Sequence, residues 1–115
     1  MRLTTDFWVS AIVRTVFKDG GFAAIIKRGA TEAGAVFILS RNRLGETSLY
    51  APAPQTSYDS ARPDDRHFVL LASDQDSAAI EARLAKEQRF DPDIWVIEIE
   101  AGPVPVDKII SVRSS

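Results

Sequence analysis

The stretch that decides the fold is Phe90-Asp-Pro-Asp-Ile-Trp-Val-Ile-Glu-Ile-Glu100. Its first part ends a helix, because the residue before a proline is pushed out of the α-helical region and Asp91 precedes Pro92. Its second part predicts a strand over residues 94–100, since side chains of a strand alternate between the two faces of a sheet. One face carries Trp95, Ile97 and Ile99, and the other carries Ile94, Val96, Glu98 and Glu100. The second face is thus apolar in its first half and acidic in its second.

A helix precedes this stretch over residues 77–89, which are rich in alanine, glutamate, arginine, lysine and glutamine. These residues have high intrinsic helix propensity. Ser73 or Asp74 is the expected N-cap, since a short oxygen-bearing side chain satisfies the first free N–H groups of a helix. The apolar stripe is thin, chiefly Ile80 and Leu84, so the helix should lie on the surface.

A first helix is predicted from about residue 6 to residue 19, where Gly20-Gly21 ends it. Polar side chains recur every fourth residue and form one narrow stripe, at Ser10, Arg14 and Lys18. The rest of the circumference is apolar, so the helix should be buried on several sides, by the sheet and a second element or by another subunit. The candidate interface residues are Trp8, Ile12 and Val16.

Further strands are predicted where apolar, β-branched and aromatic residues cluster between turn residues, at 22–28, 35–41, 47–51 and 67–72. The first three are expected to form an antiparallel meander. The element order is then α-β-β-β-β-α-β, which predicts an α+β fold: a mostly antiparallel sheet of about five strands with both helices on one face. We expect one domain over residues 1–115, with residues 103–115 as a loosely ordered tail or a short extra strand.

Composition narrows the class of protein. A chain of 115 residues with 45% hydrophobic and 26% charged residues is typical of a single globular domain. It contains no cysteine, which excludes disulfides, thiol nucleophiles and thiolate metal sites. The absence of cysteine fits the reducing cytoplasm and is also compatible with the periplasm. No apolar run approaches the roughly 18 residues of a membrane span. The net charge of −2 gives no general reason to bind nucleic acid or an anionic membrane, so we expect neither as a partner.

Four carboxylates around the deciding stretch form one candidate site: Asp91, Asp93, Glu98 and Glu100. Hard oxygen ligands of this kind suit magnesium or manganese, and a bound metal ion can activate water. The pattern is therefore compatible with a small metal-dependent hydrolase. The favoured interpretation of these carboxylates is a solvated strand face next to a helix-ending turn.

A second candidate site is basic. Lys27 and Arg28 precede Gly29 at a glycine-bounded turn, and Arg66 and His67 begin a later strand. Backbone N–H groups and basic side chains at such a turn can cradle an anion or a nucleotide. The P-loop spacing is absent and the turn leads into another strand, so the alternative is a hairpin end with solvated charges.

Several strings resemble an uncharacterised bacterial family, the domain of unknown function 1491. They are residues 2–9 (RLTTDFWV), residues 34–37 (GAVF) after the Lys27-Arg28-Gly29 turn, residues 50–55 (YAPAPQ) and residues 90–98 (FDPDIWVIE). The resemblance covers nearly all of the chain except about the last dozen residues. It implies a small, stand-alone, cytoplasmic bacterial protein, and it brings no reaction, ligand or site residue with it.

The leading functional hypothesis is a non-enzymatic binding or assembly module that forms a homodimer or binds another protein. The strongly apolar first helix and the lack of a complete catalytic set favour it. No cofactor is evident in the sequence, and magnesium or manganese enters only with the hydrolase alternative. Anion or nucleotide binding is the third hypothesis.

Overall fold

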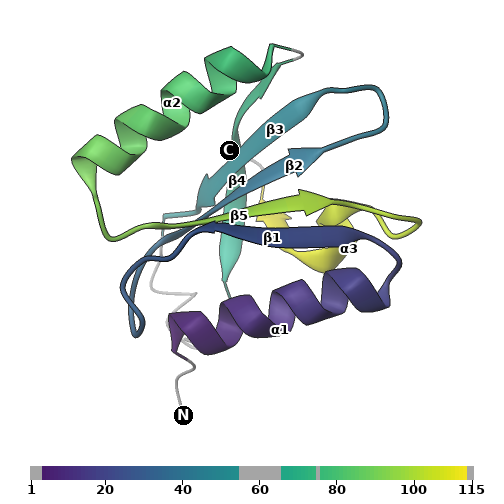
Figure 1. Cartoon of the computed structure of the whole chain (residues 1–115), viewed down its shortest axis with the longest axis horizontal. Helices are drawn as coiled ribbons and strands as arrows, with labels where there is room; N and C mark the ends of the chain where they lie inside the picture. The colour runs from purple at the N-terminus through teal and green to yellow at the C-terminus, as the bar shows by residue number, and fades with distance from the viewer. Residues whose placement is uncertain (1–3, 55–65, 75, 114–115) are drawn as a thin grey trace.

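A computed structural model describes residues 4–54, 66–74 and 76–113. The elements in chain order are α1 (Thr5–Lys18), β1 (Phe22–Lys27), β2 (Val36–Arg41), β3 (Thr47–Pro52), β4 (His67–Asp74), α2 (Ser77–Phe90), β5 (Trp95–Glu100), α3 (Val106–Ile109) and β6 (Ser111–Arg113), as Figure 1 shows. The predicted α+β class is confirmed. The described residues form one sheet of six strands with three helices, against an expected sheet of about five strands with two helices. The sixth strand, β6, lies within residues 103–115, where a short extra strand was one of the two expectations, and the third helix is the four-residue α3.

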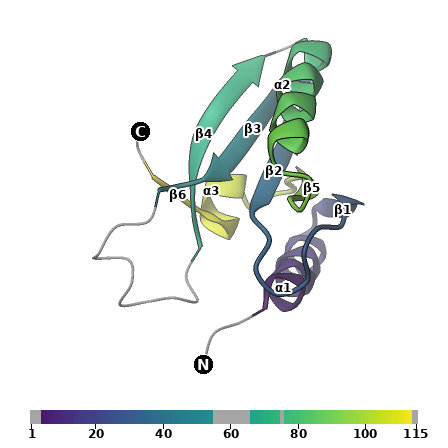
Figure 2. The same ribbon diagram turned by 90° about the vertical axis from the view of Figure 1, so that its left-hand side faces the viewer.

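The strands lie in the order β1-β5-β2-β3-β4-β6. β5 pairs antiparallel with β1 and parallel with β2, and β6 pairs parallel with β4, so the sheet is mixed. The predicted meander of the first three strands was therefore wrong, because β5 lies between β1 and β2. The antiparallel meander that does form is β2-β3-β4. Figure 2 shows α3 and β6 beside β4 at the far edge.

The two long helices cover opposite faces of the sheet (Figure 1), and the prediction that both cover one face was wrong. The alternation of β5 causes this arrangement, because both of its faces carry apolar residues that need cover. The core on the α1 side contains Val9, Val16, Ala23, Val36, Ile38, Phe68, Trp95, Ile97, Ile99 and Ile110. The core on the α2 side contains Phe37, Leu39, Leu49, Ala51, Ile80, Leu84, Ile94 and Val96.

The acidic half of β5 lies beyond the cover of α2. Ile80 and Leu84 of α2 pack in the same core as Ile94 and Val96, and α2 contacts β3 and β4. Glu98 is only partly buried and Glu100 is exposed at the end of the strand. The change from apolar to acidic side chains along this face therefore marks where the helix stops covering the sheet.

The helix caps differ from those that the sequence predicts, which are Thr5 or Asp6 for α1 and Ser73 or Asp74 for α2. Thr4 caps α1, and its hydroxyl accepts a hydrogen bond from the N–H of Phe7. Asp76 caps α2 by accepting from the N–H of Ala78, whereas Ser73 and Asp74 belong to β4. In the part of the chain that the structure describes, no helix is both long and apolar enough to cross a bilayer.

Candidate functional site

The turn between β1 and β2 is held against the turn that precedes β5. The Lys27 Nζ donates to the carbonyl oxygens of Pro92, at 2.6 Å, and Ile94, at 3.0 Å. The Ala30 N–H donates to the Asp93 carbonyl at 3.0 Å, and the Trp95 Nε1–H donates to the Ala30 carbonyl at 2.8 Å. Lys27, predicted as an anion-binding residue, therefore joins two turns of the fold.

The other predicted basic residues also contact protein groups. The Arg28 guanidinium lies 5.0 Å from the centre of the Trp95 ring, within the range of a cation–π contact. The Arg66 guanidinium lies 5.4 Å from the Trp8 ring, and its Nη2 donates to the Thr5 hydroxyl at 2.8 Å. His67 Nδ1 lies 2.8 Å from the Ser111 hydroxyl oxygen and so links β4 to β6.

The N-terminal end of α1 is likewise engaged. The first N–H groups of a helix attract anions when they are left without partners. Here the N–H of Thr5 donates to the Glu32 carbonyl and the N–H of Asp6 to the Thr31 carbonyl. The loop between β1 and β2 thus occupies the place that an anion would take at this helix end.

The four predicted metal ligands do not lie together. Asp91 and Asp93 sit in the turn before β5, where Asp91 Oδ1 accepts the N–H of Asp93 at 3.0 Å. Glu98 and Glu100 lie towards the other end of β5, about 10 and 16 Å beyond its first residue, Trp95, at about 3.3 Å per residue. Among residues 4–54, 66–74 and 76–113, no group of three or more histidine, cysteine, aspartate or glutamate side chains is placed to hold a metal ion.

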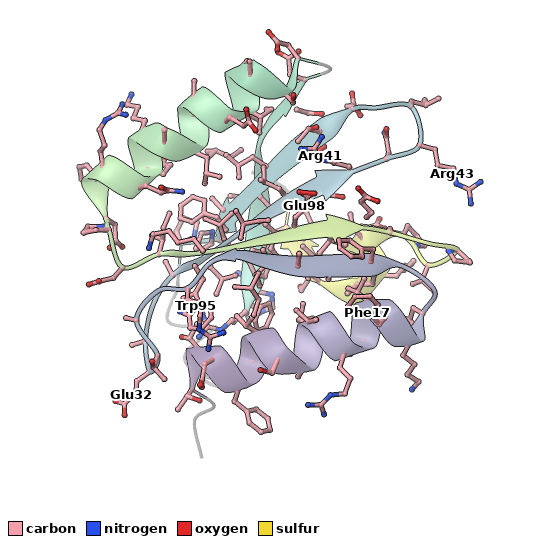
Figure 3. All side chains as sticks on the ribbon, viewed as in Figure 1. Phe17, Glu32, Arg41, Arg43, Trp95 and Glu98 are labelled. Carbon is pink, nitrogen blue, oxygen red and sulfur yellow. The ribbon has the colours of Figure 1, made fainter. Side chains whose placement is uncertain are left out.

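Glu98 has a partner that sequence reasoning missed. Its Oε1 lies 3.4 Å from Arg41 Nε, and Figure 3 shows the two side chains next to each other. Arg41 pairs with Glu100 across β2–β5 and with Thr47 across β2–β3, so these side chains form a row on the face that α2 partly covers. The Thr47 hydroxyl is buried with no hydrogen-bond partner among the described residues. Only the pairing of β5 with β2, which the sequence does not reveal, brings this row together.

Two small pockets open on that side of the sheet. One, of about 220 Å³, lies at the end of the β2–β3 hairpin and is lined by Arg41, Asn42, Arg43, Gly45, Glu100 and Ala101. The other, of about 240 Å³, lies at the C-terminal end of α2 and is lined by Ala35, Phe37, Ala51, Pro52, Leu71, Glu87, Phe90, Asp91 and Ile94. Most residues that line the first pocket are polar or charged, with both signs of charge, whereas the second pocket is mostly apolar.

The predicted interface residues of α1 pack within the protomer. Val16 is completely buried, and Trp8 and Ile12 are half-buried against the same core. Other large apolar side chains of α1 and β1 do reach the surface: Phe7 is 60% exposed and Ile26 55%, and Phe17 and Phe22 are 51% and 48% exposed. Phe17 and Phe22 contact each other. Their rings meet edge to face with centres 5.6 Å apart, and Figure 3 shows Phe17 at the end of α1 beside β1.

The comparisons with known proteins agree with the strings quoted from the sequence. Residues 3–104 match the family model described as protein of unknown function (DUF1491). The chain belongs to the DUF1491 family. No curated protein matches it.

Solved structures of bacterial relatives share the fold. A solution structure of a protein from A. tumefaciens is 41% identical, with a TM-score of 0.82, and the match covers 100% of this chain and 98% of that one. A crystal structure of a DUF1491 protein from Caulobacter crescentus is 32% identical, with a TM-score of 0.71 and 87% of each chain covered. An NMR structure of a DUF1491 protein from Caulobacter crescentus is 28% identical, with a TM-score of 0.77 and 100% and 98% covered.

Proposed function

We propose that this DUF1491 protein is a non-enzymatic assembly module that forms a homodimer by pairing strand β1 with its copy. In this proposal the dimer forms in the cytoplasm and needs no metal or cofactor. A chain without cysteine has no disulfide that the reducing conditions there could break. The observation that supports it is the exposed apolar edge of the sheet at β1.

Strand β1 is the outer strand at one side of the sheet and is six residues long. The strand at the opposite edge, β6, has three residues. An edge strand presents unpaired N–H and C=O groups, and proteins usually protect such edges by keeping the strand short or by placing charges on it. β1 instead carries Phe22 and Ile26, which are 48% and 55% exposed.

The sequence of β1 is complementary to itself. In an antiparallel pair with its twofold axis at Ala24, Phe22 of one copy faces Ile26 of the other, and the same contact recurs on the opposite side of the axis. Such an isologous contact closes after two subunits and does not propagate. Directly opposite side chains in antiparallel strands lie about 5 Å apart, so each Phe22–Ile26 pair would bury two apolar groups that are exposed in the monomer.

The neighbouring surface supports the same contact. The small side chain at Ala24 leaves room for the two strands to approach at the axis. Phe17 from α1 continues the apolar surface beside Phe22. The register of β1 shifts between Ile25 and Lys27, so Ile26 lies at the irregular end of the edge and its contact with Phe22 of the other copy departs from an ideal cross-strand pair. We therefore expect a dimer of modest affinity.

Sedimentation velocity over a concentration series tests the proposal. The wild-type mass should rise from 12.7 kDa towards twice that value as the concentration approaches about 1 mM, where a free energy of association near −4 kcal/mol gives half dimer. Ile26→Lys should stay monomeric, because a charge on an edge strand opposes pairing.

Leu44→Lys is the matched control, since it makes the same kind of change at a side chain that is 83% exposed on the β2–β3 turn, outside the β1 edge strand. It should associate like the wild type. A wild-type chain that stays monomeric throughout the series, or an Ile26→Lys variant that associates as the wild type does, would refute the proposal.

A further inference from the structure

The pocket at the C-terminal end of α2 has an apolar floor. Phe37, Ala51 and Ile94 are buried there, at 7%, 9% and 1% exposure, between the sheet and the helix. An apolar cavity of about 150 Å³ accommodates benzene, so 240 Å³ is enough for one leucine or phenylalanine side chain. We call this pocket, with the lining residues given above, the α2 groove.

The groove exists because the last turn of α2 does not fill the core beneath it. The buried residues of α2 are Ile80 and Leu84, and the next position on the same stripe is Glu87. Phe90 ends the helix and is 91% exposed, so its ring does not cover the floor. Alanines at positions 35 and 51 on the sheet side leave the remaining space open.

Two carboxylates lie in the lining of this apolar pocket. Glu87 is half-buried and Asp91 is exposed. They sit at the C-terminal end of a helix, where the helix dipole adds negative potential and favours a cation. Arg83 Nε lies 3.4 Å from Glu87 Oε1, but an ion pair between partly exposed residues four apart on a helix is weak and can be exchanged for another. Asp91 uses Oδ1 for the N–H of Asp93.

We propose that the α2 groove binds a segment of another protein in which a bulky apolar side chain stands next to an arginine or lysine. The apolar side chain occupies the pocket above Phe37 and Ile94, and the cation lies against Glu87 and Asp91. Phe90 then contacts the bound segment, which gives a reason for a phenylalanine exposed to this extent. This site is separate from the β1 edge and does not depend on dimer formation.

The experiment is an NMR titration of the ¹⁵N-labelled Ile26→Lys variant, so that pairing at β1 plays no part. The probes are two peptides, acetyl-Gly-Leu-Arg-Gly-amide and acetyl-Gly-Leu-Glu-Gly-amide. The arginine peptide should shift the amides of Ala35, Leu71 and Ile94 and bind about fivefold more tightly than the glutamate peptide, as expected for an exposed ion pair.

Charge reversal at the groove sharpens the test. Glu87→Lys should abolish or invert the preference between the two peptides. Glu81→Lys makes the same change on an exposed part of α2 outside the pocket and should leave the preference unchanged. Equal affinity for both peptides in the parent variant, or shifts centred outside the groove, would overturn the proposal. Shifts of the groove amides on protein dilution without peptide would also overturn it, because a second copy would then be the occupant.

Discussion

Replacing Gly29 by alanine should disrupt the contact between the β1–β2 turn and the turn before β5 and so lower the stability of the fold. A Cβ atom at this position would lie 2.1 Å from the Asp93 carbonyl oxygen and 2.6 Å from the carbonyl carbon and oxygen of Ile94. These are backbone atoms, so no side-chain rotation can relieve the clash and one of the two turns has to move.

The expected cost follows from the hydrogen bonds that join the turns. Moving the Gly29 segment breaks the bonds from Ala30 N–H to Asp93, from Trp95 Nε1–H to Ala30 and from Lys27 Nζ to Ile94. Three bonds at about 1 kcal/mol each give about 3 kcal/mol. The smaller conformational freedom of alanine in the unfolded chain returns up to about 1 kcal/mol. We therefore expect the free energy of unfolding to fall by about 2–3 kcal/mol.

Gly45→Ala is the matched control, because it makes the same substitution where nothing lies within 4 Å. Gly45 has a φ of +83°, so the cost there comes from the left-handed backbone and should be about 1 kcal/mol after the unfolded-state gain. Urea denaturation measures both free-energy changes, and the m-values should stay unchanged. If Gly29→Ala lowers the free energy of unfolding no more than Gly45→Ala does, the close packing of the two turns does not stabilise the fold as argued above.

Three further substitutions test single groups. Lys27→Met should lower the free energy of unfolding by about 2 kcal/mol, because the charged hydrogen bonds to Pro92 and Ile94 are lost, and urea denaturation measures it; an unchanged midpoint would remove Lys27 from the structural role. Thr47→Val should raise the free energy of unfolding by up to about 1 kcal/mol, since a methyl group replaces a buried hydroxyl that has no partner among the described residues. Thermal denaturation measures this change, and a lower melting temperature would contradict it. Burial, followed by the charges of Asp107 and Glu46, raises the pKa of Tyr50 above 10.0. Above pH 10 the unfolded chain therefore loses the tyrosine proton first, stability falls as the pH rises, and Tyr50→Phe should flatten that fall in denaturation measured at several alkaline pH values.

Local structure was predictable from the sequence because its causes are local. The helix expected at residues 77–89 is Ser77–Phe90, and the strand expected at residues 94–100 is Trp95–Glu100. Propensity, alternation and the Asp91-Pro92 stop act within a few residues of each boundary. The sequence also showed that the second face of β5 is apolar in its first half and acidic in its second. The reason for this division, the part of the sheet that α2 covers, became clear only from the structure.

The strand order and the candidate sites depend on contacts distant in sequence, and these were not predictable. β5 enters between β1 and β2, more than 50 residues away along the chain, and pattern alone does not choose a strand's neighbours. The length of β5 itself separates Asp91 from Glu100, whereas the insertion of β5 beside β2 brings Arg41 next to Glu98. The α2 groove arises where the buried stripe of a helix ends at Glu87, and its position could not be known before the face covered by that helix was known.

The pairing of β1 with its copy is tested most directly by Ala24→Cys. The natural chain has no cysteine, so a single introduced thiol can form a disulfide only with a second copy. With the twofold axis at Ala24, the two residues face each other at a Cα separation of about 4.5–5.5 Å, which suits a disulfide. Under mild oxidation Ala24→Cys should convert to a covalent dimer faster and more completely than Leu44→Cys, although residue 44 is far more exposed. Equal or slower cross-linking of Ala24→Cys would contradict a dimer built on this strand.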